Sequence, residues 1–189
     1  MILNSSLIRY IQAFGRLNCD NSKYLGIAPH KPVLLLAVLR LYEENLIQNN
    51  EITPSPDLEA MFKQVWHEYV RSGHRLRLAM PFYHMKNEPF WYLNIYVGYE
   101  ADAADKSKMR YLSSLRKAVR YAVIDNELCL LMQDAAFREV LSNFLINRYF
   151  HQQEPDSPEC INETSVAKSD VITEAVSDGQ NRLNEYLAA

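Results

Sequence analysis

The sequence of 189 residues is poor in glycine, in cysteine and in long apolar runs, and each shortage excludes a class of protein. Five glycines and eight prolines exclude a collagen-like or low-complexity chain. The longest apolar run, residues 33–39, is far shorter than the roughly 20 residues that a membrane-spanning helix needs. The amino terminus lacks a basic stretch followed by an apolar one, so we expect neither a secretory signal nor a membrane partner.

The sequence also lacks the motifs of common metal and nucleotide sites. Its three cysteines are odd in number and far apart, which argues against a disulfide framework or a CxxC metal site. It contains no P-loop, no GxGxxG, no HExxH and no HNH nuclease motif. We therefore expect no metal, no cofactor and no catalytic residues, and a cytoplasmic location is the default.

Charge divides the chain into two parts, although its formal net charge is only −3. Residues 151–189 hold eight acidic and two basic residues, which leaves 15 acids and 18 bases in residues 1–150. The second part is polar and begins with a proline-containing stretch typical of a linker. We therefore predict a domain over 1–150 and an acidic linker or tail over 151–189, with room for one short helix at 169–187. The mildly basic body is compatible with a polyanionic partner.

Hydrophobic periodicity predicts an α+β domain that is predominantly helical. Helices are expected over residues 4–17, 32–47, 106–123 and 134–150, and another, capped by Asp57, is expected to end at Gly73. The aromatic and β-branched run 90–97 predicts a strand, with 75–81 as its short partner. The expected result is a compact helical domain with one small antiparallel sheet and a polar C-terminal tail.

Three segments carry basic side chains in settings that suit an anion. Residues 28–32, Ala-Pro-His-Lys-Pro, place His30 and Lys31 at the start of a helix, where free backbone N–H groups favour a negative charge. Residues 75–91 interleave basic and aromatic side chains, which suits phosphates and stacked bases, and the turn between Pro81 and Pro89 is expected to project residues 82–86.

The third segment, residues 106–120, holds six basic residues and no acidic one. On a helix, Lys106, Arg110, Lys117 and Arg120 would lie near one side. From the residues alone, each segment also has an ordinary structural interpretation. The first fits a rigid loop, the second fits a hairpin whose aromatic side chains belong to the core, and the third fits a solvated helix face.

Taken in order, these motifs resemble one family. Ala-Pro-His-Lys-Pro before an apolar helix, Met-Pro-Phe-Tyr-His-Met before Phe-Trp-Tyr-Leu, and the ending at 141–150 are similar to the sulfur-binding domain of phosphorothioate-dependent, McrA-like type IV HNH restriction endonucleases. The resemblance covers roughly residues 5–150. It implies a reader module of modification-dependent restriction that binds duplex DNA in which sulfur replaces a non-bridging phosphate oxygen in the Rp configuration.

The resemblance also implies a shallow apolar cavity for the sulfur, walled by basic residues. Pro81 stands at the position of the cavity floor, Met80 where an aromatic residue is usual and His84 where a small residue is usual, and Tyr83 completes the expected cavity. His30 and Lys31 match the pair that approaches the modified phosphate. The other expected DNA-phosphate contacts are Arg75, Arg77, Lys86, Lys106, Lys108 and Arg110.

Two alternatives remain open at this point: a DNA-binding module that is indifferent to sulfur, and a small enzyme that uses His30, Lys31 and His84. The expected partner is phosphorothioated double-stranded DNA. An HNH nuclease domain usually follows in the family and is absent from residues 151–189. Two explanations are open: a longer parent chain supplies the nuclease domain, or this is a stand-alone reader. A homodimer is left open.

Overall fold

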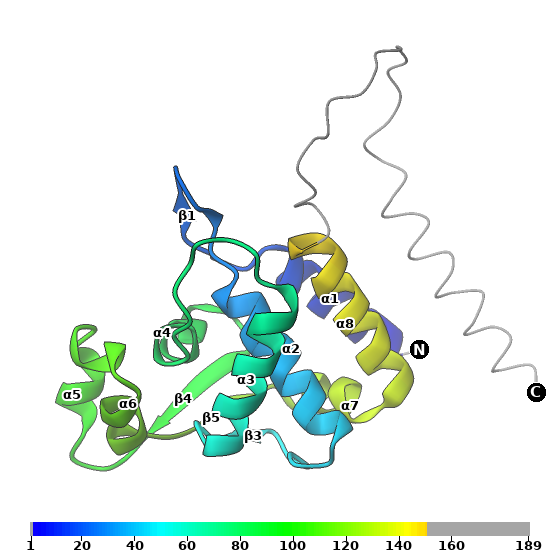
Figure 1. Cartoon of the computed structure of the whole chain (residues 1–189). Helices are drawn as coiled ribbons and strands as arrows, with labels where there is room; N and C mark the ends of the chain where they lie inside the picture. The colour runs from blue at the N-terminus through cyan, green and yellow to red at the C-terminus, as the bar shows by residue number, and fades with distance from the viewer. Residues whose placement is uncertain (1, 151–189) are drawn as a thin grey trace, which may run out of the picture. The chain divides into compact units, whose positions relative to one another are not determined.

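The computed structural model describes residues 2–150, and within that range the chain forms eight α-helices and five short strands (Figure 1). The longer helices are α1 (Ile2–Gly15), α2 (His30–Glu43), α3 (Pro56–Tyr69), α7 (Asn126–Gln133) and α8 (Ala135–Tyr149). The shorter ones are α4 (Ala79–His84), α5 (Glu100–Ala104) and α6 (Leu112–Ala118), with 3-10 turns η1 (Met85–Asn87) and η2 (Lys108–Arg110). The prediction of a predominantly helical α+β fold is confirmed.

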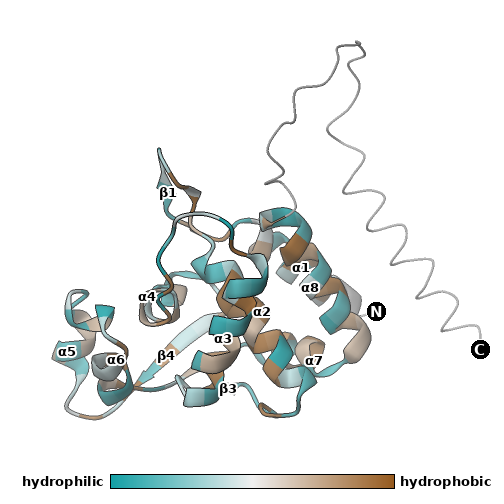
Figure 2. Cartoon of the chain, in the orientation of Figure 1, coloured by the Kyte–Doolittle hydropathy of each residue, from teal (hydrophilic) through white to brown (hydrophobic). Residues whose placement is uncertain are grey.

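Helix α2 forms the centre of the hydrophobic core. Every residue from Lys31 to Leu39 is buried, and α2 packs against α3, α4, α7 and α8. A helix that is apolar on all sides is stable in water only when other elements cover it. The loop that arches from α3 to α4 is by contrast mostly hydrophilic (Figure 2).

A three-stranded antiparallel sheet packs beside this core, with the order β3 (Glu51–Ile52), β5 (Val119–Ile124), β4 (Trp91–Ile95). The predicted strand at 90–97 is therefore confirmed as β4, and its partner is β5, with Trp91 opposite Ile124. Strands β1 (Asn21–Ser22) and β2 (Gly26–Ile27) form a separate hairpin that projects from the body (Figure 1). The sequence analysis did not predict this hairpin.

The prediction of a strand at 75–81 is wrong. Residues 70–78 form the loop between α3 and α4, and Pro81 lies in the first turn of α4. A proline in the first turn of a helix loses no hydrogen bond, because the first N–H groups have no partner within the helix. A proline inside a paired strand would instead remove a bond of the ladder.

The prediction of a helix over 106–123 is correct only for Leu112–Ala118, because a turn and the 3-10 turn η2 precede this segment and a strand follows it. Helix α6 ends at Ala118, and β5 begins at the next residue. Along β5 the buried residues Val119, Ala122 and Ile124 are separated by more exposed ones, and β-branched and aromatic side chains are frequent. The basic helix face expected at Lys106, Arg110, Lys117 and Arg120 does not exist, because these residues belong to three different elements and a loop.

Helix boundaries also differ from the prediction. Ser55, not Asp57, is the N-cap of α3; its hydroxyl accepts a hydrogen bond from the N–H of Leu58 at 3.1 Å. Helix α3 ends at Tyr69 rather than at Gly73, and α2 ends at Glu43 rather than at residue 47. The helix predicted at 134–150 is confirmed as α8 and is capped by Asp134. The helix expected at 169–187 lies outside the described residues.

Candidate functional site

His30 begins α2 and joins it to the loop between α3 and α4. Its Nε2 lies 2.8 Å from the backbone oxygen of Arg75, and its ring packs on Trp66 with centroids 4.8 Å apart. The first turn of α2 contains no acidic residue, and the N-cap residue Pro29 offers no side-chain hydrogen bond. The positive end of this 14-residue helix is therefore uncompensated by its own first turn.

The two histidines of the predicted site, His30 and His84, both have a lowered pKa. The pKa of His30 is lowered below its ordinary value by burial, and the nearby His74 and Arg77 act in the same direction. The pKa of His84 is also lowered, first by burial and then by Lys31, Lys106 and Lys86, while Asp20 opposes the shift. Both imidazoles therefore favour the neutral form more than a free histidine does.

Lys31 points into the protein. Its side chain is only 8 % exposed, and its ammonium group forms an ion pair with Glu88, whose side chain is 6 % exposed. The backbone N–H of Asn18 donates to the same Glu88 oxygen at 3.2 Å. This pair ties the start of α2 to the residue that follows η1. A phosphate could therefore contact the Lys31 ammonium only by entering the protein surface and competing with Glu88 for it.

The expected cavity residues all belong to α4, but they differ in accessibility. Pro81 and Tyr83 are buried, whereas Met80 and His84 are half-buried. The expectation that residues 82–86 project from a turn is wrong, because Phe82, Tyr83 and Met85 belong to the core. They are buried because α4 packs against α2, which leaves little room for their side chains to turn outward.

Tyr83 faces a groove on the side of β4 and α5. Its hydroxyl donates to the backbone oxygen of Ala103 at 2.8 Å and accepts from Lys86 Nζ at 2.6 Å. An open groove of about 410 Å³ is lined by Tyr83 and Lys86 together with residues of β4 and α5. Met80, Pro81 and His84 do not line this groove, but the ring of Tyr83 also packs edge-on against the ring of His84, with centroids 5.1 Å apart.

The remaining residues that are expected to contact phosphate lie at the surface but differ in their interactions with neighbouring side chains. Arg75, Arg77, Lys86, Lys106, Lys108 and Arg110 are all exposed. Lys108 forms an ion pair with Asp102, which reduces its availability to an anion. Lys106 and Lys86 are close enough to His84 to affect its pKa, and Arg77 is close enough to affect that of His30.

The β1–β2 hairpin is a feature of this region that the sequence analysis missed. Tyr24 at its tip is 89 % exposed, and Leu25 and Ile27 are also exposed. The hairpin leads through Ala28 and Pro29 directly into α2. A Cβ on Gly73 would lie 3.2 Å from the Leu25 side chain, so the hairpin also contacts the loop after α3. The glycine at position 26 is the only local signal in the sequence; in the structure it has the positive φ that glycine adopts readily in tight turns.

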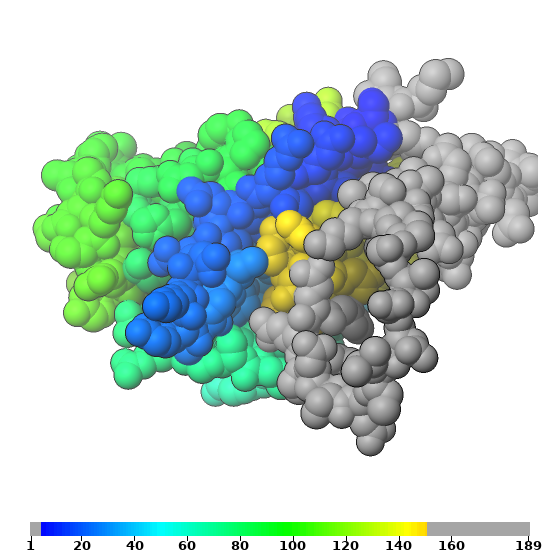
Figure 3. Space-filling view, turned by 90° about the horizontal axis from the view of Figure 1, so that it is seen from above, coloured from blue at the N-terminus to red at the C-terminus, as the bar shows by residue number. Residues whose placement is uncertain are grey.

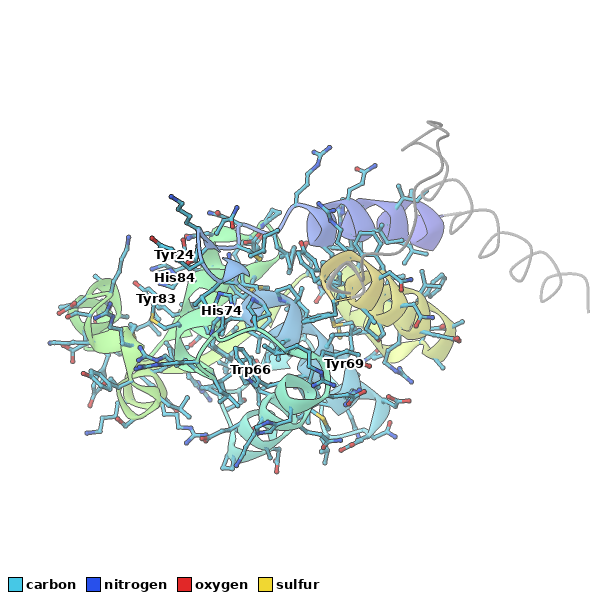
Figure 4. The ribbon with its side chains drawn as sticks, turned by 45° about the horizontal axis from the view of Figure 1, so that its top comes forward. Tyr24, Trp66, Tyr69, His74, Tyr83 and His84 are labelled. Carbon is cyan, nitrogen blue, oxygen red and sulfur yellow. The ribbon has the colours of Figure 1, made fainter. Side chains whose placement is uncertain are left out.

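The figures support this arrangement of the hairpin. Figure 4 shows Tyr24 at the same end of the body as His84 and Tyr83, with Trp66 and Tyr69 farther along. From above, the blue segment that contains the hairpin lies at the surface beside green residues (Figure 3). Segments 21–31 and 72–86 thus contribute to one end of the body.

Among residues 2–150, no cluster of His, Cys, Asp or Glu side chains has the composition and spacing to hold a metal ion. Every helix in the same range is too short or too polar to cross a bilayer.

A helical domain with basic side chains and a helix N-terminus gathered at one end is typical of a domain that binds a polyanion. The family model described as ScoMcrA-like, DNA sulfur-binding domain matches residues 8–163, and the chain belongs to this family. No curated protein matches the chain. The matched domain is therefore a DNA-binding domain rather than a catalytic one, and its family binds sulfur-modified DNA.

We expect DNA binding to tighten as the pH falls. The pKa of His84 is lowered in the free domain, first by burial. The predicted contact with a DNA phosphate would favour the imidazolium and raise this pKa in the complex. Affinity should be constant at high pH, increase as the pH falls through the pKa of the complex, and level off below the pKa of the free protein. Each unit of difference between the two pKa values corresponds to about tenfold in affinity.

Titrations at pH 8.0 to 5.5 with a fixed duplex and fixed salt measure this effect. His84→Gln should reduce the pH dependence, whereas His67→Gln, at an exposed histidine of α3, should leave it unchanged. Identical pH profiles for the parent protein and His84→Gln would remove His84 from the phosphate site.

Proposed function

We propose that this domain reads the Rp phosphorothioate in duplex DNA by placing its sulfur in an apolar cavity at α4. Met80, Pro81, Tyr83 and His84 are the cavity residues of this proposal, and His30 and Lys31 contact the modified phosphate. Arg75, Arg77, Lys86, Lys106, Lys108 and Arg110 contact the surrounding backbone. Tyr83 has the weakest support among the cavity residues, because its hydroxyl is engaged by Ala103 and Lys86.

One observation carries the proposal: the two motifs that are distant in sequence meet at the start of α2. Helix α2 packs against α4, and the charge of Lys31 affects the pKa of His84. A buried proline on α4 therefore lies in the same region as a helix N-terminus whose first turn contains no acidic residue. This combination supports a site that accepts a phosphate group with one apolar face.

The chemistry of sulfur explains why such a site discriminates. Sulfur is larger and softer than oxygen and is a poorer hydrogen-bond acceptor, so burial against proline costs it little. A phosphate oxygen in the same place loses water and gains no partner, at a cost of about 1–3 kcal/mol. That cost corresponds to roughly 5- to 150-fold in affinity. The basic residues attract either phosphate, so they set the affinity and its salt dependence.

An equilibrium titration with three otherwise identical short duplexes tests the proposal. One duplex carries a single Rp phosphorothioate, one carries the Sp isomer, and one is unmodified. We expect the Rp duplex to bind about 5- to 150-fold more tightly than the unmodified one. The Sp duplex should resemble the unmodified one, because its sulfur points away from the cavity. Equal binding to all three would favour a generic DNA-binding module.

The same proposal includes the biological setting. A reader without chemistry of its own serves restriction of modified DNA when an HNH nuclease domain is attached in the parent chain. Residues 1–150 are the DNA-binding unit of this proposal, and 151–189 are the acidic linker or tail. The family match extends to residue 163, so it includes the first part of that tail.

A further inference from the structure

The ion pair between Lys31 and Glu88 stands out because both partners are buried beside a site that must bind an anion. Lys31 is the second residue of α2, and Glu88 follows the 3-10 turn after α4. Glu88 is also held by the backbone N–H of Asn18. A carboxylate fixed at this place opposes phosphate binding, and nothing in the proposed function requires it.

The other cations near the site have no buried acidic partner, although Lys86 donates a hydrogen bond to the hydroxyl of the buried Tyr83. Arg75, Arg77, Lys86 and Lys106 are exposed, and among residues 2–150 no acidic side chain forms a recorded ion pair with any of them. They can attract any phosphate that reaches the surface. The charge of Lys31 is different, because Glu88 neutralises it from inside the protein.

We propose that Glu88 is a specificity-determining residue that withholds the Lys31 ammonium from unmodified phosphate. The proposal rests on the proposed sulfur-reading function and assigns Glu88 a role within the same site. An isolated ammonium at the start of α2 would draw every phosphate of the backbone toward it. Paired with Glu88, it presents almost no net charge to a phosphate that stays at the surface.

Because Lys31 is buried, a phosphate can contact its ammonium group only after it enters the cavity. The Lys31 side chain is only 8 % exposed, so a phosphate reaches it only by moving in against α4 and α2. A sulfur can enter at little cost, whereas an oxygen loses its hydration without compensation. The modified phosphate therefore replaces the Glu88 carboxylate as the partner of Lys31, and the unmodified phosphate remains outside. The ion pair thus adds to the selectivity of the apolar surface.

Glu88→Gln is the direct test, because it removes the negative charge and keeps the size of the side chain. Without the Glu88 charge to hold it, the flexible Lys31 side chain can extend toward the surface and meet an unmodified phosphate there. We therefore expect affinity for the unmodified duplex to rise about tenfold, the size of one additional charge-assisted contact. The slope of log K against log salt should steepen by about one phosphate contact. The preference for the Rp duplex should fall. Glu44→Gln makes the same change in net charge at the exposed opposite end of α2 and should alter neither slope nor preference.

Unchanged affinity and slope for the unmodified duplex in Glu88→Gln would overturn the proposal. A thermal melt establishes whether this variant is folded. If it is not, the double replacement Lys31→Met with Glu88→Met decides, because apolar residues can replace a buried ion pair with little loss of stability.

In the double variant, the slope of log K against log salt for the unmodified duplex should equal that of the parent protein, because unmodified DNA does not contact Lys31 in the parent protein. A slope shallower by about one would mean that unmodified DNA already contacts Lys31, and would overturn the proposal. These slopes are measured without sulfur. They therefore remain informative about Glu88 even if the parent protein fails to prefer the Rp duplex, a result that would contradict the proposed function instead.

Discussion

Replacing Pro81 with glutamate is expected to abolish the preference for phosphorothioated DNA. Pro81 is buried in the first turn of α4, beside the half-buried Met80. A carboxylate there repels the phosphate and replaces an apolar surface with one that must remain hydrated. The sulfur then loses its advantage over oxygen, so the Rp and unmodified duplexes should bind with equal affinity. A parent preference of roughly 5- to 150-fold would fall to about one.

Pro81→Gln separates the effect of charge from that of size. It is as long as glutamate and neutral, so it should retain overall DNA affinity while it lowers the preference for sulfur. Pro81→Ala keeps the surface apolar and should preserve most of the preference. The three variants are compared in the same three-duplex titration after a thermal melt has established that each is folded. A Pro81→Glu protein that is folded and still prefers the Rp duplex would exclude Pro81 from the sulfur cavity.

Local sequence patterns predict the parts of this fold that depend on one element at a time. Helix α8 and strand β4 are found where periodicity and composition place them. The prediction for 106–123 is wrong at its end because the periodicity fits a helix, whereas the chain from Val119 onward pairs with β4 and β3. Pairing between Trp91 and Ile124 joins residues far apart in sequence, and a local window cannot detect it.

In the candidate site, too, local motifs are predictable from the sequence, whereas contacts between distant residues are not. His30, Lys31 and Pro81 are recognisable from two short motifs and their order. Glu88 gives no comparable signal, because its partner Lys31 is 57 positions away and each residue alone resembles a solvated surface charge. The hairpin with Tyr24 has strands of only two residues, which are too short for an alternating pattern. Burial of Lys31 is likewise a property of the assembled core.

Replacing Phe82 with alanine is expected to cause the largest loss of stability among the variants considered. Phe82 is fully buried and packs edge-to-face on Trp91, with centroids 5.4 Å apart. Deletion of a buried aromatic ring costs about 3–5 kcal/mol, because it loses hydrophobic burial and leaves a cavity. A domain of this size has a free energy of unfolding of about 5–15 kcal/mol, so about a fifth or more of the stability is at risk.

Urea denaturation of the parent protein and Phe82→Ala measures this loss. Tyr24→Ala removes an aromatic ring at a position that is 89 % exposed and should change the free energy of unfolding by less than about 0.5 kcal/mol. The contrast matters for function, because Phe82 lies on α4 between Pro81 and His84 and joins that helix to β4. A Phe82→Ala protein as stable as the parent would mean that α4 is not anchored through this ring. The position of Pro81 would then depend on contacts with α2 instead.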